Sequence, residues 1–130
     1  NEESQTNPKY YEKMSVLLNE LIQERNQETI DYQNYLEKIK QLAKDVSDPA
    51  SNVSYPNNIN TKAKQALYDN LENDEDLSIL LDETIRYKKL DGFRDGGIKE
   101  KKLRIEVNKI INDPQKTMEL MDIIKAQSEY

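Results

Sequence analysis

The spacing of apolar side chains near the amino terminus constrains the fold of this chain of 130 residues more than any other feature. Eleven positions follow one another at alternating steps of three and four residues, which is the repeat of one face of an α-helix. Pro8 stands where a helix can begin, and no glycine follows it in this segment. The pattern predicts a helix over residues 9–46, about 55 Å long at ~1.5 Å per residue. Its stripe is Tyr11, Met14, Leu18, Leu21, Arg25, Glu28, Tyr32, Tyr35, Ile39, Leu42 and Val46.

Two polar residues interrupt this stripe at its middle. Arg25 and Glu28 occupy positions where a continuous buried face would carry apolar side chains. Either the helix splits or kinks there, or the two residues face water between separate packing patches. Charged core positions also make a poor self-associating coiled coil. Packing within the domain is therefore the favoured use of the stripe, with a homodimeric helical scaffold as the alternative.

The rest of the chain predicts shorter helices and no strand. Residues 47–60 form a loop by composition, with Pro49 and Pro56 among serines and asparagines. Four helices follow, and no alternation of period two appears. The prediction is an all-α protein of about five helices in a single domain. Residues 1–8 would be a disordered lead, 9–46 the long helix, 47–60 the loop, and 61–127 a four-helix bundle on which the long helix packs.

Each shorter helix has an expected buried face, and three of the four have an expected N-cap. The capping residues are Asn60 or Thr61 for the first, Asn73 or Asp74 for the second, and Asp113 with Pro114 behind it for the last. The faces expected to point inward are Ala63, Ala66, Leu67 and Leu71; Leu77, Leu80, Leu81, Thr84 and Ile85; Leu103, Val107, Ile110 and Ile111; and Met118, Met121 and Ile124.

Composition excludes several classes of protein. Leu, Ile, Val and Phe make up about 23% of the chain, just above the ~20% below which a sequence fails to fold, so we expect a thin core. Without cysteine there is no disulfide framework or Cys-based zinc site, and without histidine the usual catalytic triads and His-ligated metals are lost. No apolar run approaches a membrane span, and no signal peptide is evident. A cytoplasmic protein with no membrane partner is expected.

Charge is distributed unevenly along the chain. The segment from Asp69 to Glu83 holds seven acidic and no basic residues, whereas the segment from Arg86 to Lys109 holds nine basic and four acidic residues. Part of this separation complements the dipole of the second short helix. The net charge of −6 argues against general affinity for nucleic acid, although one face can still be locally positive.

All three glycines of the chain lie in the stretch LDGFRDGGIKEKKLR, residues 90–104. The interval from Gly92 to Gly97 matches a phosphate-binding loop, but Ile98 precedes Lys99, no Ser or Thr follows, and a helix rather than a strand comes before. A helix end closed by Gly92 in the left-handed conformation, with Phe93 pinned to the core, is the better interpretation. We expect no catalytic residue, no bound cofactor and no metal site in this chain.

The basic residues after this turn are the best candidates for a partner surface. They are Arg94, Lys99, Lys101, Lys102 and Arg104. Three interpretations stay open: a solvated helix face, a contact with phosphate, or a contact with an acidic protein. Arg94 could point outward or brace a neighbouring element.

Three segments resemble the carboxyl-terminal end of type I restriction enzyme R subunits. They are YPNNINTKAKQALYDNL (55–71), DGFRDGGIKEKKLR (91–104) and IIKAQSEY (123–130). The turn departs from the family pattern, with Phe93 in place of an expected Trp and Asp95-Gly96-Gly97 in place of a Gly-Asn-Pro type sequence. The residues that match the motif as structural positions are Asn60, Thr61, Leu67, Tyr68, Asp69, Asn70, Leu71, Asp91, Gly92 and Phe93.

The resemblance implies a function in assembly. Such R subunits carry a nuclease domain and ATP-dependent motor domains, and their carboxyl-terminal helical domain is thought to dock onto the methyltransferase core of modification and specificity subunits. This chain would be a non-enzymatic, carboxyl-terminal piece of a larger endonuclease whose ATP and magnesium sites lie elsewhere. Its partners would be the methyltransferase subunits, and DNA through the complex or by direct contact of the basic helix, with no small-molecule substrate.

Overall fold

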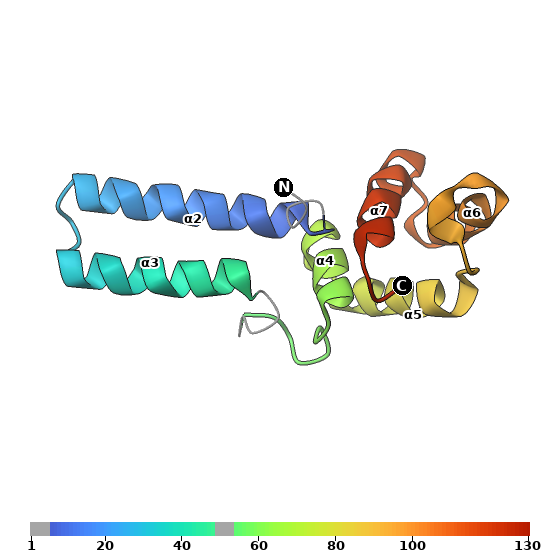
Figure 1. The fold of residues 1–130 in the computed structure, drawn as a ribbon, viewed down its shortest axis with the longest axis horizontal. Coiled ribbons are helices and arrows are strands. Elements are labelled where there is room, and N and C mark those ends of the chain that lie inside the picture. Colours follow the sequence, from blue (N-terminus) through green and yellow to red (C-terminus); the bar gives the residue numbers. More distant parts are fainter. Residues whose placement is uncertain (1–5, 49–53) are drawn as a thin grey trace.

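The computed structural model describes residues 6–48 and 54–130. The regular secondary structure of this part of the chain is α-helix with one turn of 3-10 helix, so the predicted all-α fold class is confirmed (Figure 1). The expected loop over 47–60 includes residues 49–53, which lie outside the described residues. The elements are α2 (Pro8–Asn26), α3 (Tyr32–Ser47), α4 (Lys62–Asn70), α5 (Glu75–Lys88), η2 (Phe93–Asp95), α6 (Gly97–Ile111) and α7 (Pro114–Ala126).

The long helix expected over residues 9–46 is two helices that form an antiparallel hairpin (Figure 1). The chain reverses between α2 and α3 because Glu28 adopts a left-handed conformation, with φ 57°. The Thr29 hydroxyl and amide both donate to the Glu24 carbonyl, and Asp31 caps α3 by accepting from the Asn34 amide at 2.8 Å. The polar interruption at Arg25 and Glu28 therefore marks a split, the first of the two outcomes that the sequence left open.

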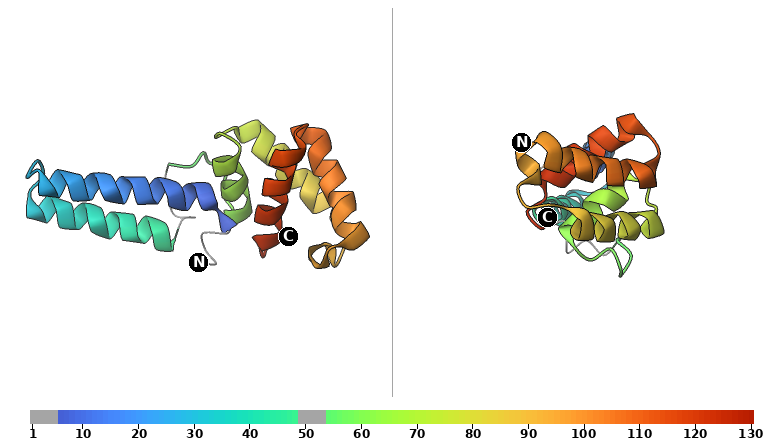
Figure 2. Two further views of the ribbon diagram at one scale, coloured as in Figure 1. Left: turned by 90° about the horizontal axis from the view of Figure 1, so that it is seen from above. Right: turned by 90° about the vertical axis from the view of Figure 1, so that its right-hand side faces the viewer.

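The reversal lets the apolar stripe fold back on itself. The hairpin projects from one end of the molecule and contacts the rest mainly at its base (Figure 2). Tyr10 and Met14 are buried there, whereas Leu18, Ile22 and Leu36 toward the tip stay more than a third exposed. Two helices alone cover only one side of each stripe, so part of the apolar surface faces solvent.

The helices α4 to α7 enclose the core. Phe93, Leu103 and Val107 are buried, as is the predicted face of α4. Of the predicted faces of α5 and α7, Leu81, Ile85, Met121 and Ile124 are buried, whereas Leu77 and Thr84 are only partly buried. Leu80 and Met118 were expected inside, but they are 51% and 53% exposed. Helix α5 packs against α4 and α6, and α7 against α6 and α4. Each helix therefore has an outer side that no other helix covers, and these two residues lie on it.

The predicted N-caps are confirmed, each at one of the positions that the sequence offered. Thr61 Oγ1 accepts from the Lys64 amide, Asp74 accepts from the Leu77 amide, and Asp113 accepts from two amides of α7. A capping side chain satisfies amides that have no partner within the helix. Because these bonds form between near neighbours in sequence, the helix starts could be predicted locally.

The hairpin is joined to the α4–α7 body by a polar cluster around Asp69. Asn7 Nδ2 donates to Asp69 Oδ2 at 2.7 Å, and the Tyr55 hydroxyl donates to the same oxygen. Asn70 Nδ2 donates to Asn7 Oδ1 at 3.0 Å, so residues 63 positions apart are linked directly. Asn7 is buried and bonded, which corrects the expectation of a disordered lead over 1–8 for its described part; residues 1–5 lie outside the described residues.

Asp69 makes the stability of this junction depend on pH. Burial raises the pKa of Asp69 above its ordinary value of 3.8, against the lowering effect of the hydrogen bonds from Tyr55 and Asn7. The folded protein therefore holds this proton more tightly than the unfolded chain does. Stability is favoured while the group is protonated and declines as the pH rises through the raised pKa.

Replacing Asp69 with asparagine is expected to remove this decline. The amide keeps an oxygen that accepts from Asn7 and Tyr55 but carries no charge, so wild type should lose stability relative to Asp69→Asn as the pH is raised toward neutrality. Urea unfolding across that range measures the difference. Asp122→Asn, at an exposed position of α7, is the matched control. Parallel pH curves for wild type and Asp69→Asn would contradict the prediction.

Within residues 6–48 and 54–130, no helix is both long enough and apolar enough to cross a membrane. The same residues contain no group of three or more carboxylate, thiol or imidazole side chains arranged to hold a metal ion.

Candidate partner interface

The glycine-containing stretch forms a tight turn between α5 and α6. Gly92 is left-handed with φ 84°, as predicted, but it does not close the helix: α5 ends at Lys88 with Lys89 as its C-cap, and Gly92 precedes η2 instead. The Phe93 amide donates to the Leu90 carbonyl at 3.1 Å. The 3-10 turn η2 follows, closed by Gly96, which also has a positive φ of 85°. The Phe93 ring is buried in the core, as expected, and anchors the turn. This geometry positions the first turn of α6.

Arg94 braces the turn against the end of α7. Its Nε donates to the Lys125 carbonyl at 3.1 Å, and its NH2 group donates to the Gln127 carbonyl at 2.5 Å. The guanidinium also lies over the Phe93 ring, 4.9 Å from the centroid. A cation at these carbonyls satisfies acceptors that the helix end leaves open. Of the two roles expected for Arg94, the structure shows the brace rather than a free outward contact.

Helix α6 presents a mixed basic and apolar face to solvent. At about 100° per residue, Ile98, Lys101, Lys102 and Ile105 lie within one stripe opposite the buried side of the helix. The two isoleucines are 74% and 46% exposed. Lys101 and Lys102 are exposed as well. The cations of this face were predicted from the sequence but its two isoleucines were not, although their spacing from the lysines could have indicated them.

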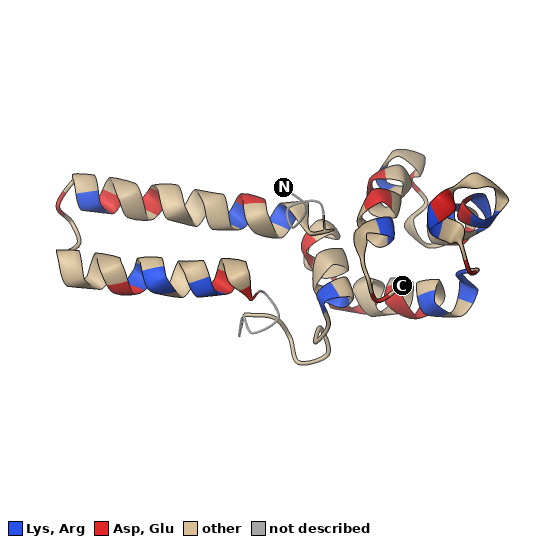
Figure 3. Cartoon of the chain, in the orientation of Figure 1, with Lys and Arg blue, Asp and Glu red and all other residues tan. Residues whose placement is uncertain are grey.

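Most cations of this helix are not neutralised by neighbouring carboxylates. The ion pairs that involve α6 join Lys109 to Glu106 at 3.2 Å and Lys125 of α7 to Glu100 at 3.0 Å. In the described part of the chain, no carboxylate lies within 4.0 Å of the charged atoms of Lys101, Lys102 or Arg104. Figure 3 shows the blue segments on α6 and at the end of α5.

The five predicted surface residues do not form one cluster. Lys101 and Lys102 are exposed on the outer half of α6, Arg104 is half-buried on its flank, and Lys99 is turned away from them and lies near the Gly92 turn. Arg94 is held against α7. Lys101 therefore lies between the other two: Lys102 is on one side of it, and Arg104 is on the other side, toward α7. Lys102 and Arg104 themselves point in different directions.

A shallow groove of about 400 Å³ runs along the side of this face, between α6 and the start of α7. Ile105 and Met118 supply its apolar surface, and Arg104 and Lys109 stand among its lining residues. The Thr117 hydroxyl donates to Asn108 Oδ1 at 2.9 Å at the same place. A groove with apolar walls and positive charge fits a partner segment that combines apolar and acidic side chains.

The residues that carry the family resemblance mainly build the fold. Thr61 caps α4, Leu67 and Leu71 are core residues, and Asn70 is buried. Tyr68 packs edge-on against Tyr55. Asn60, Asp91 and Gly92 are exposed at loop positions, and Asn60 Oδ1 accepts from Lys64 Nζ at 3.5 Å.

A network at the end of the described chain was not predicted. The buried Asp82 carboxylate accepts from the Tyr130 hydroxyl at 2.5 Å and from Arg86 Nε at 3.0 Å. Burial and the bond to Asp82 raise the pKa of Tyr130, so this phenol stays protonated as the donor. Glu129 accepts from Arg86 at 3.2 Å and from the Ala63 amide at 2.6 Å. The segment after α7 is thereby tied to both α4 and α5.

Comparisons with protein-family models, curated proteins and solved structures found no match to this chain.

Proposed function

We propose that this chain is a non-catalytic docking domain that joins a larger protein to an acidic partner surface through α6. The observation that carries the proposal is the outer face of α6, where exposed isoleucines alternate with lysines that have no acidic partner among the described residues. Exposed apolar residues with charges at their margin are typical of protein interfaces rather than of a surface that only meets water.

The resemblance supports a particular assembly. We propose that the domain belongs to the carboxyl-terminal region of a type I restriction R subunit and docks the motor onto the methyltransferase core. Segments that resemble this family and are distant in sequence meet in one body: Arg94 bonds to carbonyls at the end of α7, and Glu129 bonds to the start of α4. Under this proposal the protein works in the cytoplasm, and the nuclease, ATP and magnesium sites belong to other domains of the parent enzyme.

Competition is the direct test of docking. The domain, added in excess, is expected to displace the full-length R subunit from the methyltransferase complex of the same system. Size-exclusion chromatography of the mixture measures the displacement. A domain that leaves the assembled enzyme unchanged at high excess would contradict the assembly role.

Charge reversal on α6 should weaken this docking. The double variant Lys101→Glu with Arg104→Glu is expected to raise the dissociation constant by about tenfold or more, because repulsion replaces attraction on this side of α6. The matched control is Lys38→Glu with Lys44→Glu on α3, which changes the net charge equally at exposed positions. Equal weakening by the two pairs would show a general charge effect and contradict the α6 interface. Circular dichroism checks that both variants stay helical.

Direct contact with DNA is the second candidate function, favoured by the same lysines. Phosphate binding would make the affinity for duplex DNA fall steeply with salt. The exposed Ile98 and Ile105 favour a protein partner over DNA, because a phosphate backbone offers them no apolar contact. No binding to duplex DNA at low salt, measured by fluorescence anisotropy, would exclude this alternative.

A further inference from the structure

The α2–α3 hairpin has an apolar face that no other helix in the described part of the chain covers. The hairpin contacts the body mainly at its base, so its outer part has solvent on both sides (Figure 2). At about 100° per residue, four apolar side chains fall on the same side of the contact between the two helices. This hairpin face consists of Leu18 and Ile22 of α2 and Tyr32 and Leu36 of α3, each more than a third exposed.

The opposite side of the hairpin is charged. A groove of about 310 Å³ runs along that side, and Leu17 and Leu42 lie in it among the charged residues Glu20, Glu24, Lys38 and Asp45. Leu17 and Leu18 are successive residues with nearly equal exposure, 38% and 39%, but they lie on different sides of the hairpin. The two sides therefore differ in charge rather than in the presence of leucine.

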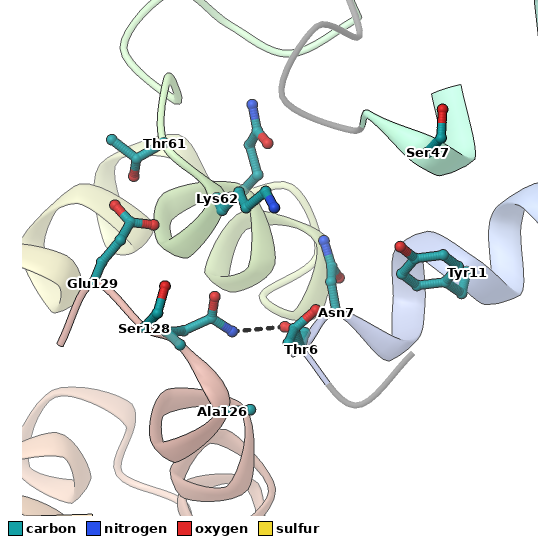
Figure 4. Close-up of a pocket in the computed structure, with 11 residues that line it drawn as sticks. Thr6, Asn7, Tyr11, Ser47, Thr61, Lys62, Ala126, Ser128 and Glu129 are labelled. Atoms are coloured by element: carbon teal, nitrogen blue, oxygen red, sulfur yellow. Dashed lines mark hydrogen bonds between the residues drawn. The ribbon is translucent and has the colours of Figure 1, made fainter. Parts of the chain in front are cut away.

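The surroundings of the hairpin face are almost free of charge. The exposed positions beside it on the two helices are Ser15, Asn19, Asn26, Gln33, Lys40 and Ala43, and Lys40 is the one charged residue in this set. Toward the base, the same side continues with Tyr11 and Ser47, which line a cavity of about 450 Å³ together with Gln65 of α4 (Figure 4). Along the whole hairpin, this side is thus apolar or neutral apart from one lysine.

The two charged residues that interrupt the apolar stripe of residues 9–46 lie at the tip of the hairpin. Glu28 is in the turn. Arg25 Nη1 donates to the Ile30 carbonyl at 3.3 Å, and its guanidinium lies over the Tyr32 ring, 5.6 Å from the centroid. Charged core positions disfavour self-association of one continuous helix. In the hairpin these charges lie beyond Leu18 and Leu36, so that argument does not apply to the hairpin face.

The chemistry of the hairpin face fits a second copy of the same chain. An acidic or nucleic-acid partner requires several cations, and a membrane-surface helix carries basic residues beside its apolar stripe. Lys40 alone does not supply them. The same face of another chain is equally apolar and equally neutral, so two copies meet without like charges opposed.

The hairpin is large enough for such an interface. Helix α2 has 19 residues and α3 has 16. At ~1.5 Å per residue and about 10 Å of width per helix, one side of the hairpin measures roughly 500 Å², and two copies cover about 1,000 Å² between them. This area is near the lower limit for a specific protein interface. A dimer with a dissociation constant in the micromolar range is therefore expected.

We propose that the hairpin face binds the same face of a second copy, so that α2 and α3 of two chains form a four-helix bundle. Leu18, Ile22 and Leu36 of both copies make up the core of this bundle, which covers the side of each stripe that a lone hairpin leaves open. The contact is isologous, with the same residues contributed by each chain. The α6 face takes no part in it, so the dimer is independent of the docking proposed above.

Sedimentation velocity of the 130-residue chain tests the dimer. Between low micromolar and submillimolar concentrations, the mass is expected to rise from the 15.2 kDa of one chain toward twice that value. A single chain at every concentration would contradict the proposal. So would a single chain that sediments with vesicles of anionic phospholipid, because that result assigns the hairpin face to a membrane surface.

A pair of neighbouring leucines tests the location. Leu18→Glu is expected to weaken the dimer by at least about tenfold, because each copy then brings a carboxylate into an apolar contact. Leu17→Glu is the matched control: it removes a leucine of the same exposure from the charged side, and the dissociation constant should stay within about twofold. Circular dichroism of the dilute chains checks that both hairpins fold.

Further variants keep the test decisive. If Leu18→Glu loses helicity, Leu36→Gln on α3 replaces it as a milder change to the same face, with weakening of the dimer again expected. Ile98→Glu on α6 should leave the dimer intact. Equal effects of Leu17→Glu and Leu18→Glu, or a dimer that is lost in Ile98→Glu and kept in Leu18→Glu, would overturn the proposal.

Discussion

Replacing Phe93 with alanine should lower the free energy of unfolding by about 3–5 kcal/mol. The ring is buried in the main core cluster with Leu103 and Val107, so its removal leaves a cavity that the surrounding helices fill only in part. The same residue anchors the turn that starts α6, and Arg94 lies over its ring. Because native domains are stable by only ~5–15 kcal/mol, this loss is a large fraction of the total.

Urea unfolding followed by circular dichroism measures this effect. The urea concentration at the unfolding midpoint should fall, while the slope of the free energy of unfolding against urea concentration stays unchanged. That combination indicates a loss of stability without a change in the unfolded chain. Tyr87→Ala is the matched control, since this aromatic residue, six positions earlier, is 84% exposed and should change stability by less than about 0.5 kcal/mol. A loss below about 1 kcal/mol for Phe93→Ala would show that the ring is not a core residue.

Replacing Arg86 with alanine should destabilise the protein by about 2–4 kcal/mol. Asp82 is 1% exposed, and the variant would leave its carboxylate buried with only the Tyr130 hydroxyl as donor. Removing one partner of a buried ion pair is costly because the remaining charge loses its compensation. The Arg86 side chain is 40% exposed, so solvent screens part of the effect and places it below that of Phe93→Ala.

A double variant separates the lost charge partner from lost packing. Adding Asp82→Asn to Arg86→Ala removes the uncompensated charge and should restore part of the stability, giving a coupling energy of about 1 kcal/mol or more in a double-mutant cycle. Arg104→Ala is the matched control, because Arg104 has no ion pair among the described residues. Simple addition of the two single effects would contradict the assignment of Asp82 and Arg86 as a pair.

Local chemistry made much of the fold predictable. Thr61, Asp74 and Asp113 cap helices by bonding to amides two or three residues ahead, and such signals can be seen in a short window of sequence. The buried face of α4 was predicted correctly for the same reason, because the helical repeat of 3.6 residues can be seen in a short stretch of sequence. The expected burial of Leu80 and Met118 was wrong, since period alone does not tell how many sides of a helix are covered.

The candidate sites also contain some residues that could be predicted from the sequence and others that could not. Lys101, Lys102 and Arg104 could be identified from charge and spacing alone, and the structure adds the groove with Ile105 and Met118 beside them. Nothing in the sequence singled out Gln65. It is 2% exposed on α4 and donates from Nε2 to the Ile59 carbonyl at 3.3 Å, so its burial follows from how the segment before α4 packs.

The amino-acid sequence by itself determined an all-helical chain, the starts of α4, α5 and α7, the glycine turn and the buried Phe93, because interactions among near neighbours specify them. Only the tertiary structure decided how these helices pack and which distant side chains meet. In the folded protein the stripe of residues 9–46 reverses direction at Glu28. Arg94 donates to carbonyls 31 and 33 residues away in the sequence, and Tyr130 donates to Asp82, which is 48 residues away. Such contacts depend on how whole helices pack, and a side chain's partner at that separation is set by packing rather than by its neighbours in sequence.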